Sequence, residues 1–191
     1  MRKSRAEASR TKENIIDAAA ATFRQDGIAA TTLIELMAAA GLTRGGFYKH
    51  FASKEEVLAQ AITHAIDGVA ATIGTAVRQR RNGTPLQRVL DAYLTTQHRD
   101  HPERGCLFAA IGPELAREGE AVRAAAAEGL ERMLDVFQQD MTRADAVVAL
   151  SASVGALMLA RLAPDATASK TILQQVRAHL LDHLPSDHVD A

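Results

Sequence analysis

The sequence contains one cysteine, Cys106, and no tryptophan, and aromatic residues make up only 4% of the chain. A single cysteine excludes an intramolecular disulfide framework and is typical of proteins from a reducing compartment. About one residue in five is alanine, a composition that favours closely packed helices over pleated strands. With 191 residues, 47% of them hydrophobic, the chain is long enough to bury a core. We therefore predict an all-α protein.

Targeting, membrane and catalytic signals are also missing. The N-terminus has no apolar segment of the kind found in signal peptides, and no apolar run approaches the roughly 20 residues of a membrane span. These absences predict a cytoplasmic protein with no membrane partner. The sequence holds no Gly-x-Ser-x-Gly motif, no Walker motif and no paired Cys/His set, so we expect neither an enzyme nor a cofactor.

Three side chains that can ligate a metal, His98, His101 and Cys106, lie close together in the sequence. A tetrahedral site needs a fourth ligand, and no second cysteine or matched histidine pair supplies one. A polar hinge loop is therefore the better interpretation of this segment, and we predict no metal site.

The net charge of −1 conceals an uneven distribution. Residues 1–54 carry nine Lys/Arg and five Asp/Glu, a net charge of +4, whereas the remaining residues carry 13 Lys/Arg and 18 Asp/Glu, a net charge of −5. A basic front on an acidic body is typical of a polyanion-binding head. From charge alone, a solvated basic tail explains the pattern equally well.

Residues 1–52 contain the start and stop signals of three helices. Residues 1–9 carry charge without periodicity, and we interpret them as a mobile basic arm. Apolar residues then recur at helical spacing over residues 10–25, and Gly27 supplies a left-handed stop. Thr32-Leu33-Ile34-Glu35 has the form of a capping box and predicts the start of a second helix.

A short turn follows the second helix. Gly41 can end that helix by adopting a positive φ, and Thr43 can cap a third helix over residues 44–50. Two short helices joined by such a turn describe a helix-turn-helix, whose second helix enters the major groove of DNA. A glycine-rich loop is the alternative, although caps and apolar spacing bracket the segment on both sides.

The predicted reading helix is short of side chains at its start. Gly45 and Gly46 follow Arg44, and glycine in a helix costs about 1 kcal/mol relative to alanine. Two glycines in succession therefore indicate that close approach to DNA matters more than helix stability. Phe47 and Phe51 are spaced to face the first helix as core, while Tyr48, Lys49 and His50 lie on the outer side.

Residues 10–58 resemble the N-terminal DNA-binding domain of the TetR/AcrR family of one-component transcriptional repressors. The resemblance rests on the first-helix pattern, the turn Ala40-Gly41-Leu42-Thr43, the signature Phe47-Tyr48-x-x-Phe51 and the segment Ser53-Lys54-Glu55-Glu56-Val57-Leu58. It implies phosphate contacts by Thr32, Thr43, Tyr48 and Lys54, with Arg44, Gly46 and His50 nearest the bases. Many relatives carry more side chain at the positions of Gly45 and Gly46, which makes Arg44 the expected base reader. The predicted DNA-binding residues are Thr32, Thr43, Arg44, Gly45, Gly46, Tyr48, Lys49, His50 and Lys54.

A second capping box, Ser53-Lys54-Glu55-Glu56, begins a helix that can run past Val77. We therefore predict a helix-turn-helix domain with a basic arm over residues 1–52 and a larger helical effector-binding and dimerisation domain over residues 53–191, about nine helices in total. The arginines at the end of this helix are interpreted as basic residues that interact favourably with the helix C-terminus. A second DNA contact is the alternative. Further helices are expected from Thr84, over 120–141, from Thr142, and over about 169–184. Gly105-Cys106-Leu107-Phe108 opens a short apolar segment that Pro113 should kink or divide.

The last two of these helices carry more apolar surface than one shielded face needs. The family resemblance implies that they pair with the same helices of a second subunit in a homodimer, and a thick monomer core is the alternative. An effector pocket in this domain should be mostly apolar. The candidate pocket residues are Tyr93, Cys106, Phe108, Met133, Phe137 and Met158.

These observations predict a transcriptional regulator, interpreted as a repressor that leaves a pseudo-palindromic DNA operator when a small, mostly apolar ligand binds. An alternative is a regulator that senses oxidants or electrophiles through Cys106. Nearby arginines and a helix N-terminus would favour the thiolate form of this cysteine. A small buried hydrophobe is the other interpretation of this cysteine.

Overall fold

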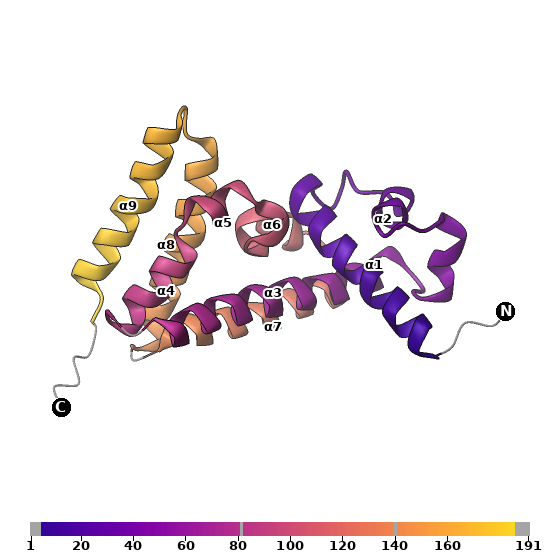
Figure 1. Ribbon diagram of the computed structural model, residues 1–191, viewed down its shortest axis with the longest axis horizontal. Helices are drawn as coiled ribbons and strands as arrows, with labels where there is room; N and C mark the ends of the chain where they lie inside the picture. Colours follow the sequence, from indigo (N-terminus) through magenta and orange to yellow (C-terminus); the bar gives the residue numbers. More distant parts are fainter. Residues whose placement is uncertain (1–4, 81, 140, 186–191) are drawn as a thin grey trace. The chain divides into compact units, whose positions relative to one another are not determined.

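The computed structural model describes residues 5–80, 82–139 and 141–185, and these residues form nine α-helices and two short 3₁₀ helices without any strand (Figure 1). The all-α prediction is confirmed. In chain order the elements are α1 (Arg5–Asp26), α2 (Leu33–Ala39), η1 (Arg44–Lys49), α3 (Lys54–Gln79), α4 (Pro85–Tyr93), α5 (Thr96–Asp100), η2 (Pro102–Arg104), α6 (Leu107–Leu115), α7 (Glu120–Gln138), α8 (Arg143–Leu162) and α9 (Ala166–His183).

The chain divides into two compact units, which we describe separately. The first unit comprises residues 1–66 and 102–129, and the second comprises residues 67–101 and 130–191. Helix α6 and the start of α7 therefore group with the N-terminal helices. The sequence did not indicate this grouping, and the domain boundary after residue 52 stays a prediction.

The core of the first unit joins α1 to the segment that follows it. Ile15, Ala19 and Phe23 of α1 are at most 1% exposed, and Leu36 and Met37 of α2 are completely buried. The positions i, i+4 and i+8 on α1 form one apolar stripe, which is the usual way in which a helix buries a face. Helix α1 packs against α2, and α2 in turn packs against η1.

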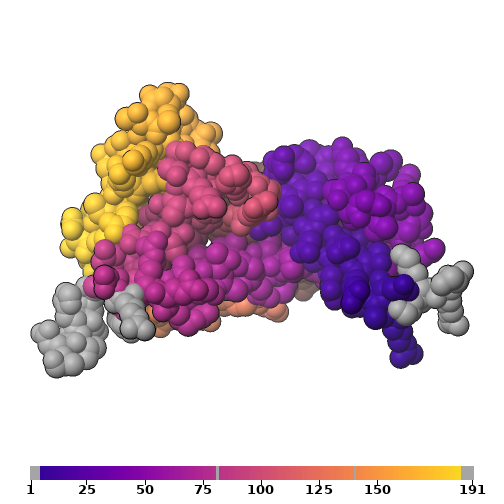
Figure 2. Space-filling view, in the orientation of Figure 1, coloured from indigo at the N-terminus to yellow at the C-terminus, as the bar shows by residue number. Residues whose placement is uncertain are grey.

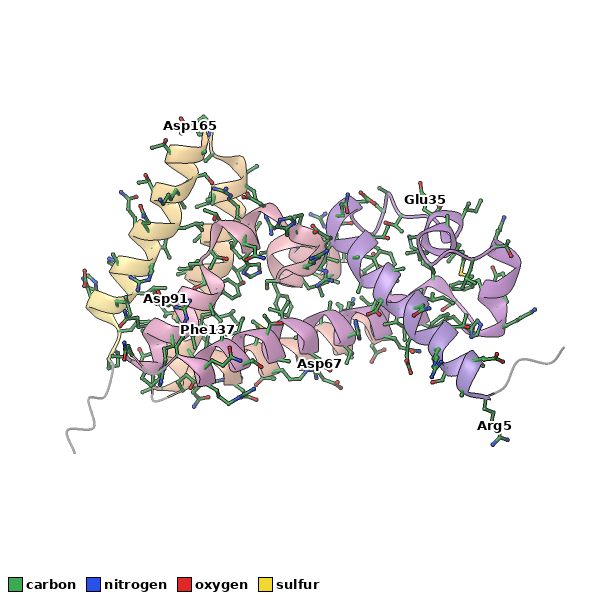
Figure 3. The ribbon with its side chains drawn as sticks, viewed as in Figure 1. Arg5, Glu35, Asp67, Asp91, Phe137 and Asp165 are labelled. Carbon is green, nitrogen blue, oxygen red and sulfur yellow. The ribbon has the colours of Figure 1, made fainter. Side chains whose placement is uncertain are left out.

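Helix α1 begins at Arg5, so the prediction of a mobile arm over residues 1–9 is wrong for residues 5–9. Two side chains support these first turns: Thr11 donates to the Glu7 carbonyl at 2.7 Å, and Ser9 donates to Glu13 at 3.0 Å. Arg5 extends from the start of the helix (Figure 3). The first turns bury no apolar face, so periodicity could not mark where the helix begins. The rest of the predicted arm, residues 1–4, lies outside the described residues.

Two short helices occupy the segment predicted as a polar loop. Helix α5 begins after Thr95, whose hydroxyl accepts a hydrogen bond from the His98 amide at 3.0 Å, and η2 follows it. The loop prediction, which covered residues 98–106, is therefore wrong for residues 98–100 and 102–104. A threonine N-cap of this kind can indicate the start of a helix in the sequence, but α5 is too short to show a periodic pattern.

Helix α6 is kinked, as Pro113 predicted. Ile111 has φ −133° and ψ 17°, outside the helical range. Proline lacks an N–H and its ring clashes with the preceding turn, so the helix cannot run straight through it. The last turn of α6, which carries Glu114, is thereby set apart from the first.

In the second unit, α8 and α9 pack against each other as an antiparallel pair (Figure 1). Asp165 begins α9 by accepting hydrogen bonds from the amides of Thr167 and Ala168, both at 2.8 Å, and lies in the turn between the two helices (Figure 3). This cap places the start of α9 at Ala166, three residues before the predicted start. The buried face of α8 consists of small residues at helical spacing: Ala146, Ala149, Ser153, Ala156 and Ala160.

Two helices, α3 and α8, are long and apolar enough to cross a membrane when judged by length and composition alone. Within their most apolar windows, 44% of α3 and 39% of α8 is buried inside the protein. Core helices of soluble proteins pass the same test, so this feature is weak evidence for a membrane span.

Candidate nucleic-acid interface

The predicted capping box at the start of α2 is present in full. The Thr32 hydroxyl accepts a hydrogen bond from the Glu35 amide at 3.3 Å, and Glu35 Oε2 accepts one from the Thr32 amide at 2.7 Å. Hydrogen bonds from the Thr32 backbone and side chain lower the pKa of the Glu35 carboxyl. Glu35 stands at the exposed start of α2 (Figure 3). The cap fixes where the first helix of the pair begins and leaves Thr32 at the surface.

The turn after α2 is closed by its own backbone. Gly41 has φ +69°, its amide donates to the Ala38 carbonyl at 2.9 Å, and the Leu42 amide donates to the Met37 carbonyl at 2.7 Å. This pair of bonds defines a Schellman motif, which requires a left-handed residue at the position of Gly41. The prediction that Gly41 ends α2 in a tight turn is therefore confirmed.

The reading segment itself is a 3₁₀ helix, η1, and not the predicted α-helix over residues 44–50. Thr43 occupies the N-cap position but its side chain makes no capping hydrogen bond; the Gly46 amide instead donates to the Thr43 carbonyl at 3.0 Å. Short segments commonly take this tighter form, and two glycines give little support to an α-helix. The Thr43 hydroxyl is exposed at the surface of the unit.

Two phenylalanines hold η1 against the rest of the first unit. Phe47 is completely buried, Phe51 is 2% exposed, and their ring centroids lie 5.6 Å apart. Tyr48 meets Phe47 edge-on at 5.3 Å but is itself 64% exposed. Arg44 and Lys49 are also exposed, whereas His50 is half-buried at the end of η1. The predicted division of η1 into a core side and an outer side is present, with His50 between the two.

The two glycines of η1 are not required by the fold of the unit. A Cβ added to Gly45 would meet nothing within 4 Å, and one added to Gly46 would lie 3.5 Å from Met37 Cε, an ordinary contact. Neither residue has a positive φ.

Lys54 has partners inside the unit. Its ammonium donates to the carbonyls of Ile28 at 2.7 Å and Thr31 at 2.6 Å, and it lies over the Phe23 ring at 5.8 Å. The residue is half-buried at the start of α3. A lysine ammonium has three N–H donors, so the predicted phosphate contact stays a prediction beside this structural one.

Two contacts that the sequence did not indicate connect α1 and the loop after it to α6 and the segment before it. Glu114 accepts hydrogen bonds from the amides of Ile28 and Ala29, and Arg24 donates to the carbonyl of Gly105 at 3.0 Å. Burial lowers the pKa of the Arg24 guanidinium. The partners are about eighty residues apart in the chain, so no local pattern could have revealed them.

The six candidate pocket residues are divided between the two units. Tyr93 and Phe137 of the second unit are completely buried with ring centroids 5.3 Å apart, and Met133 is 1% exposed. Met158 is 37% exposed on α8. Cys106 and Phe108 belong to the first unit.

The second unit has a depression of about 360 Å³ whose lining is polar rather than apolar. It is lined by Arg99, Asp100, Ala160, Arg161, Ala163, Asp165, Ala166 and Ser169, none of them a predicted pocket residue. Hydrogen bonds from Arg99 lower the pKa of Asp100. Arg161 instead donates to the carbonyls of Arg99 and His98, and Asp165 caps α9.

Cys106 is 2% exposed at the N-cap position of α6. A buried thiol is hard for an oxidant to reach, so the sensing alternative is not favoured, and the interpretation of Cys106 as a small buried residue fits the structure better. Within the described part of the chain, His, Cys, Asp and Glu form no group of three that could hold a metal ion.

Two family models match the chain. One, described as bacterial regulatory proteins of the tetR family, covers residues 15–61, and the other, a tetracyclin repressor-like C-terminal domain, covers residues 84–176. The first match contains α2, the turn and η1. The second begins at the cap of α4 and ends within α9.

Individual proteins agree with these matches. An uncharacterised HTH-type transcriptional regulator of Mycobacterium tuberculosis is 30% identical over 194 residues, covering 91% of this chain and 96% of that protein. The regulator AcrR of Shigella flexneri is 41% identical over 59 residues, covering 31% of this chain and 27% of that protein. A TetR transcriptional regulator from Legionella pneumophila shares the fold, with a TM-score of 0.75 at 22% identity over 97% of this chain and all of that one. The chain therefore belongs to the TetR family, and it is a DNA-binding transcription regulator with a helix-turn-helix.

Proposed function

We propose that the protein is a homodimeric repressor that binds a pseudo-palindromic operator through α2 and η1 and leaves it when a small ligand binds the second unit. The observation that carries this proposal is the construction of η1. Two buried phenylalanines fix it, two glycines clear its first turn, and Arg44, Tyr48 and Lys49 stand exposed beside them.

The exposed groups divide by chemistry into two roles. Arginine can donate two parallel hydrogen bonds to the O6 and N7 atoms of guanine, so we assign base reading to Arg44. Lysine, tyrosine and threonine groups at the rim, here Lys49, Tyr48 and Thr43, suit phosphate oxygens, which position a protein without reading sequence. Gly45 and Gly46 let the backbone of η1 come close to the edge of the groove.

This assignment is tested by selecting bound duplexes from a random pool and measuring the affinity of the best one across salt concentrations. Arg44→Ala should lower affinity and relax the base preference at one position by about 1–3 kcal/mol, whereas Lys49→Ala should weaken all duplexes alike and flatten the salt dependence. Equal effects of both variants on all sequences would contradict the division of roles.

The dimer is proposed from an uncovered apolar face on α8. Val147, Val148, Met158, Leu159 and Leu162 are between 37% and 80% exposed and recur at helical spacing. Between them Gly155 offers open space where a Cβ would be, so another helix can approach closely. Helix α9, which packs on α8, lies at the surface as well (Figure 2).

A second copy of the chain is the occupant that fits this face. The family typically acts as dimers, and a two-fold operator needs two reading heads related by a two-fold axis. Leu159→Glu should convert the dimer to a monomer in analytical ultracentrifugation and weaken operator binding. Leu130→Glu, on a 41% exposed leucine of α7, serves as the control and should leave the dimer intact. A Leu159→Glu protein that stays dimeric would refute this interface.

The ligand is proposed to occupy the interior of the second unit, near Tyr93 and Phe137. Ser153 of α8 is completely buried, and its hydroxyl has no hydrogen-bond partner among the described residues. A buried hydroxyl without a partner costs about 1–3 kcal/mol, which a ligand with a suitable polar atom would relieve. We therefore expect a mostly apolar ligand with few polar atoms.

A panel of small aromatic and aliphatic compounds can be screened for release of the selected duplex and for an increase in melting temperature. A compound that binds the DNA-free form more tightly must do both, because ligand binding shifts the population by its differential affinity. If no compound shifts either quantity while the duplex still binds, the ligand part of the proposal fails and the DNA-binding part stands.

A further inference from the structure

The loop between α1 and α2, residues 27–31, is short, and hydrogen bonds hold four of its five residues. It begins at Gly27, which has φ +86° and donates from its amide to the Phe23 carbonyl at 3.0 Å. The Thr31 hydroxyl donates to the Gly27 carbonyl at 2.6 Å, and Thr31 is only 2% exposed. The next residue, Thr32, caps α2. The path of this loop therefore sets the direction in which α2 and η1 leave α1.

Glu114 of α6 bonds to backbone amides of this loop. Its Oε2 atom accepts hydrogen bonds from the amides of Ile28 at 2.8 Å and Ala29 at 3.2 Å. The carboxylate lies so close that a Cβ on Gly27 would come within 3.0 Å of Oε1. Hydrogen bonds to an ionised carboxylate are shorter and about twice as strong as neutral ones.

Lys54 of α3 holds the same loop by its carbonyl side, through the bonds to Ile28 and Thr31 described above. The five-residue loop is thus bonded at its amides by the Glu114 carboxylate of α6 and at its carbonyls by the Lys54 ammonium of α3. Ile28 is bonded by both, with its amide on Glu114 and its carbonyl on Lys54. Either helix can move away only by breaking charge-assisted hydrogen bonds to the loop.

We propose that Glu114 is a positioning residue for DNA reading, and that it transmits the position of α6 to the α1–α2 loop and so to η1. This inference rests on the proposed function and names the side chain that connects α6 to the DNA-reading segment. Glu114 lies beyond the kink at Ile111, in the last turn of α6, where the helix direction has already changed. The Arg24 contact to Gly105 ties α1 to the other end of α6. Glu114 is therefore the side chain through which α6 bonds directly to the loop.

Loss of the Glu114 contacts should reduce the fraction of molecules whose loop has the DNA-reading geometry. Apparent affinity falls in proportion to that fraction. Glu114→Gln keeps one acceptor oxygen but removes the charge, and we expect roughly tenfold weaker operator binding, since about 1.4 kcal/mol corresponds to a factor of ten. Glu118→Gln removes an equal charge four residues away, from a carboxylate that makes no hydrogen bond to the loop in the described structure, and should bind like the wild type.

The coupling between α6 and η1 can be tested without the ligand, because coupling between two sites is reciprocal. Operator DNA bound at η1 must alter α6 if α6 alters DNA binding. We would measure amide hydrogen exchange over residues 27–31 and 107–115, with and without the selected duplex, for the wild type, Glu114→Gln and Glu118→Gln at saturating DNA. Melting temperatures of all three proteins separate a general loss of stability from a loss of coupling.

The expected result is that DNA slows exchange in both segments of the wild type and of Glu118→Gln, whereas in Glu114→Gln the response of residues 107–115 is lost. An equal response of that segment in Glu114→Gln would overturn the proposal, as would a wild type that binds DNA with no response there. Failure of the wild type to bind any duplex would instead refute the proposed function and the inference that rests on it.

Discussion

Replacing Gly45 by alanine tests whether DNA or the fold requires this glycine. The added methyl would meet nothing within 4 Å, and Gly45 does not have a positive φ, so the fold tolerates it. Alanine in a helix is more favourable than glycine by up to about 1 kcal/mol. The Gly45→Ala protein should therefore be as stable as the wild type or slightly more stable.

The same methyl should interfere with DNA binding if η1 lies against the groove. A displacement that costs even one charged hydrogen bond, about 1.5–3 kcal/mol, corresponds to a roughly tenfold to hundredfold loss of affinity. Fluorescence anisotropy with the selected duplex measures this loss, and a urea titration of the same protein measures stability. We predict that Gly45→Ala lowers the affinity for the duplex while the stability of the protein stays unchanged or rises.

Gly68→Ala provides the matched control. Gly68 lies exposed in α3, and a Cβ there would also meet nothing within 4 Å. This variant should gain stability by the same helix argument and keep the affinity of the wild type. If Gly45→Ala bound the duplex as tightly as Gly68→Ala, the close approach of η1 to DNA would be wrong and the two glycines would need another explanation.

Three further predictions concern the packing and capping of the two units. Phe137→Ala, at a completely buried ring, should lower the free energy of unfolding by about 3–5 kcal/mol in urea titrations, and a loss below 1 kcal/mol would contradict the packing described. Ser153→Ala removes the buried hydroxyl without a partner and should raise stability by about 1 kcal/mol, measured in the same way; a marked loss would show that the hydroxyl is bonded. Glu35 has a folded pKa below its unfolded value, so its contribution is present above the unfolded pKa of about 4.3 and is lost as pH falls through the folded pKa. Melting temperatures of wild type and Glu35→Gln should thus differ at pH 7 and converge near the bottom of an acid series, and a difference that persists unchanged would refute the cap as its source.

Local signals predicted the reading head well. Caps and turns depend on a few neighbouring residues, so the capping box of Thr32, the left-handed Gly41 and the buried Phe47 and Phe51 could all be read from spacing. The form of η1 could not, because six residues are too few for a periodic pattern to distinguish α from 3₁₀ hydrogen bonding.

The sequence by itself determined most of the longer helices and the chemistry of the exposed groups, since periodicity, caps and composition act within one turn or one helix. The tertiary structure alone decided which helices share a unit and what holds the reading head in place. Glu114 and Lys54 meet the same five-residue loop although they lie 86 and 26 positions from Ile28, and the tie from α1 to Gly105 spans 81 positions. Contacts over such separations depend on how the chain packs in three dimensions, and no pattern in the neighbouring residues records them.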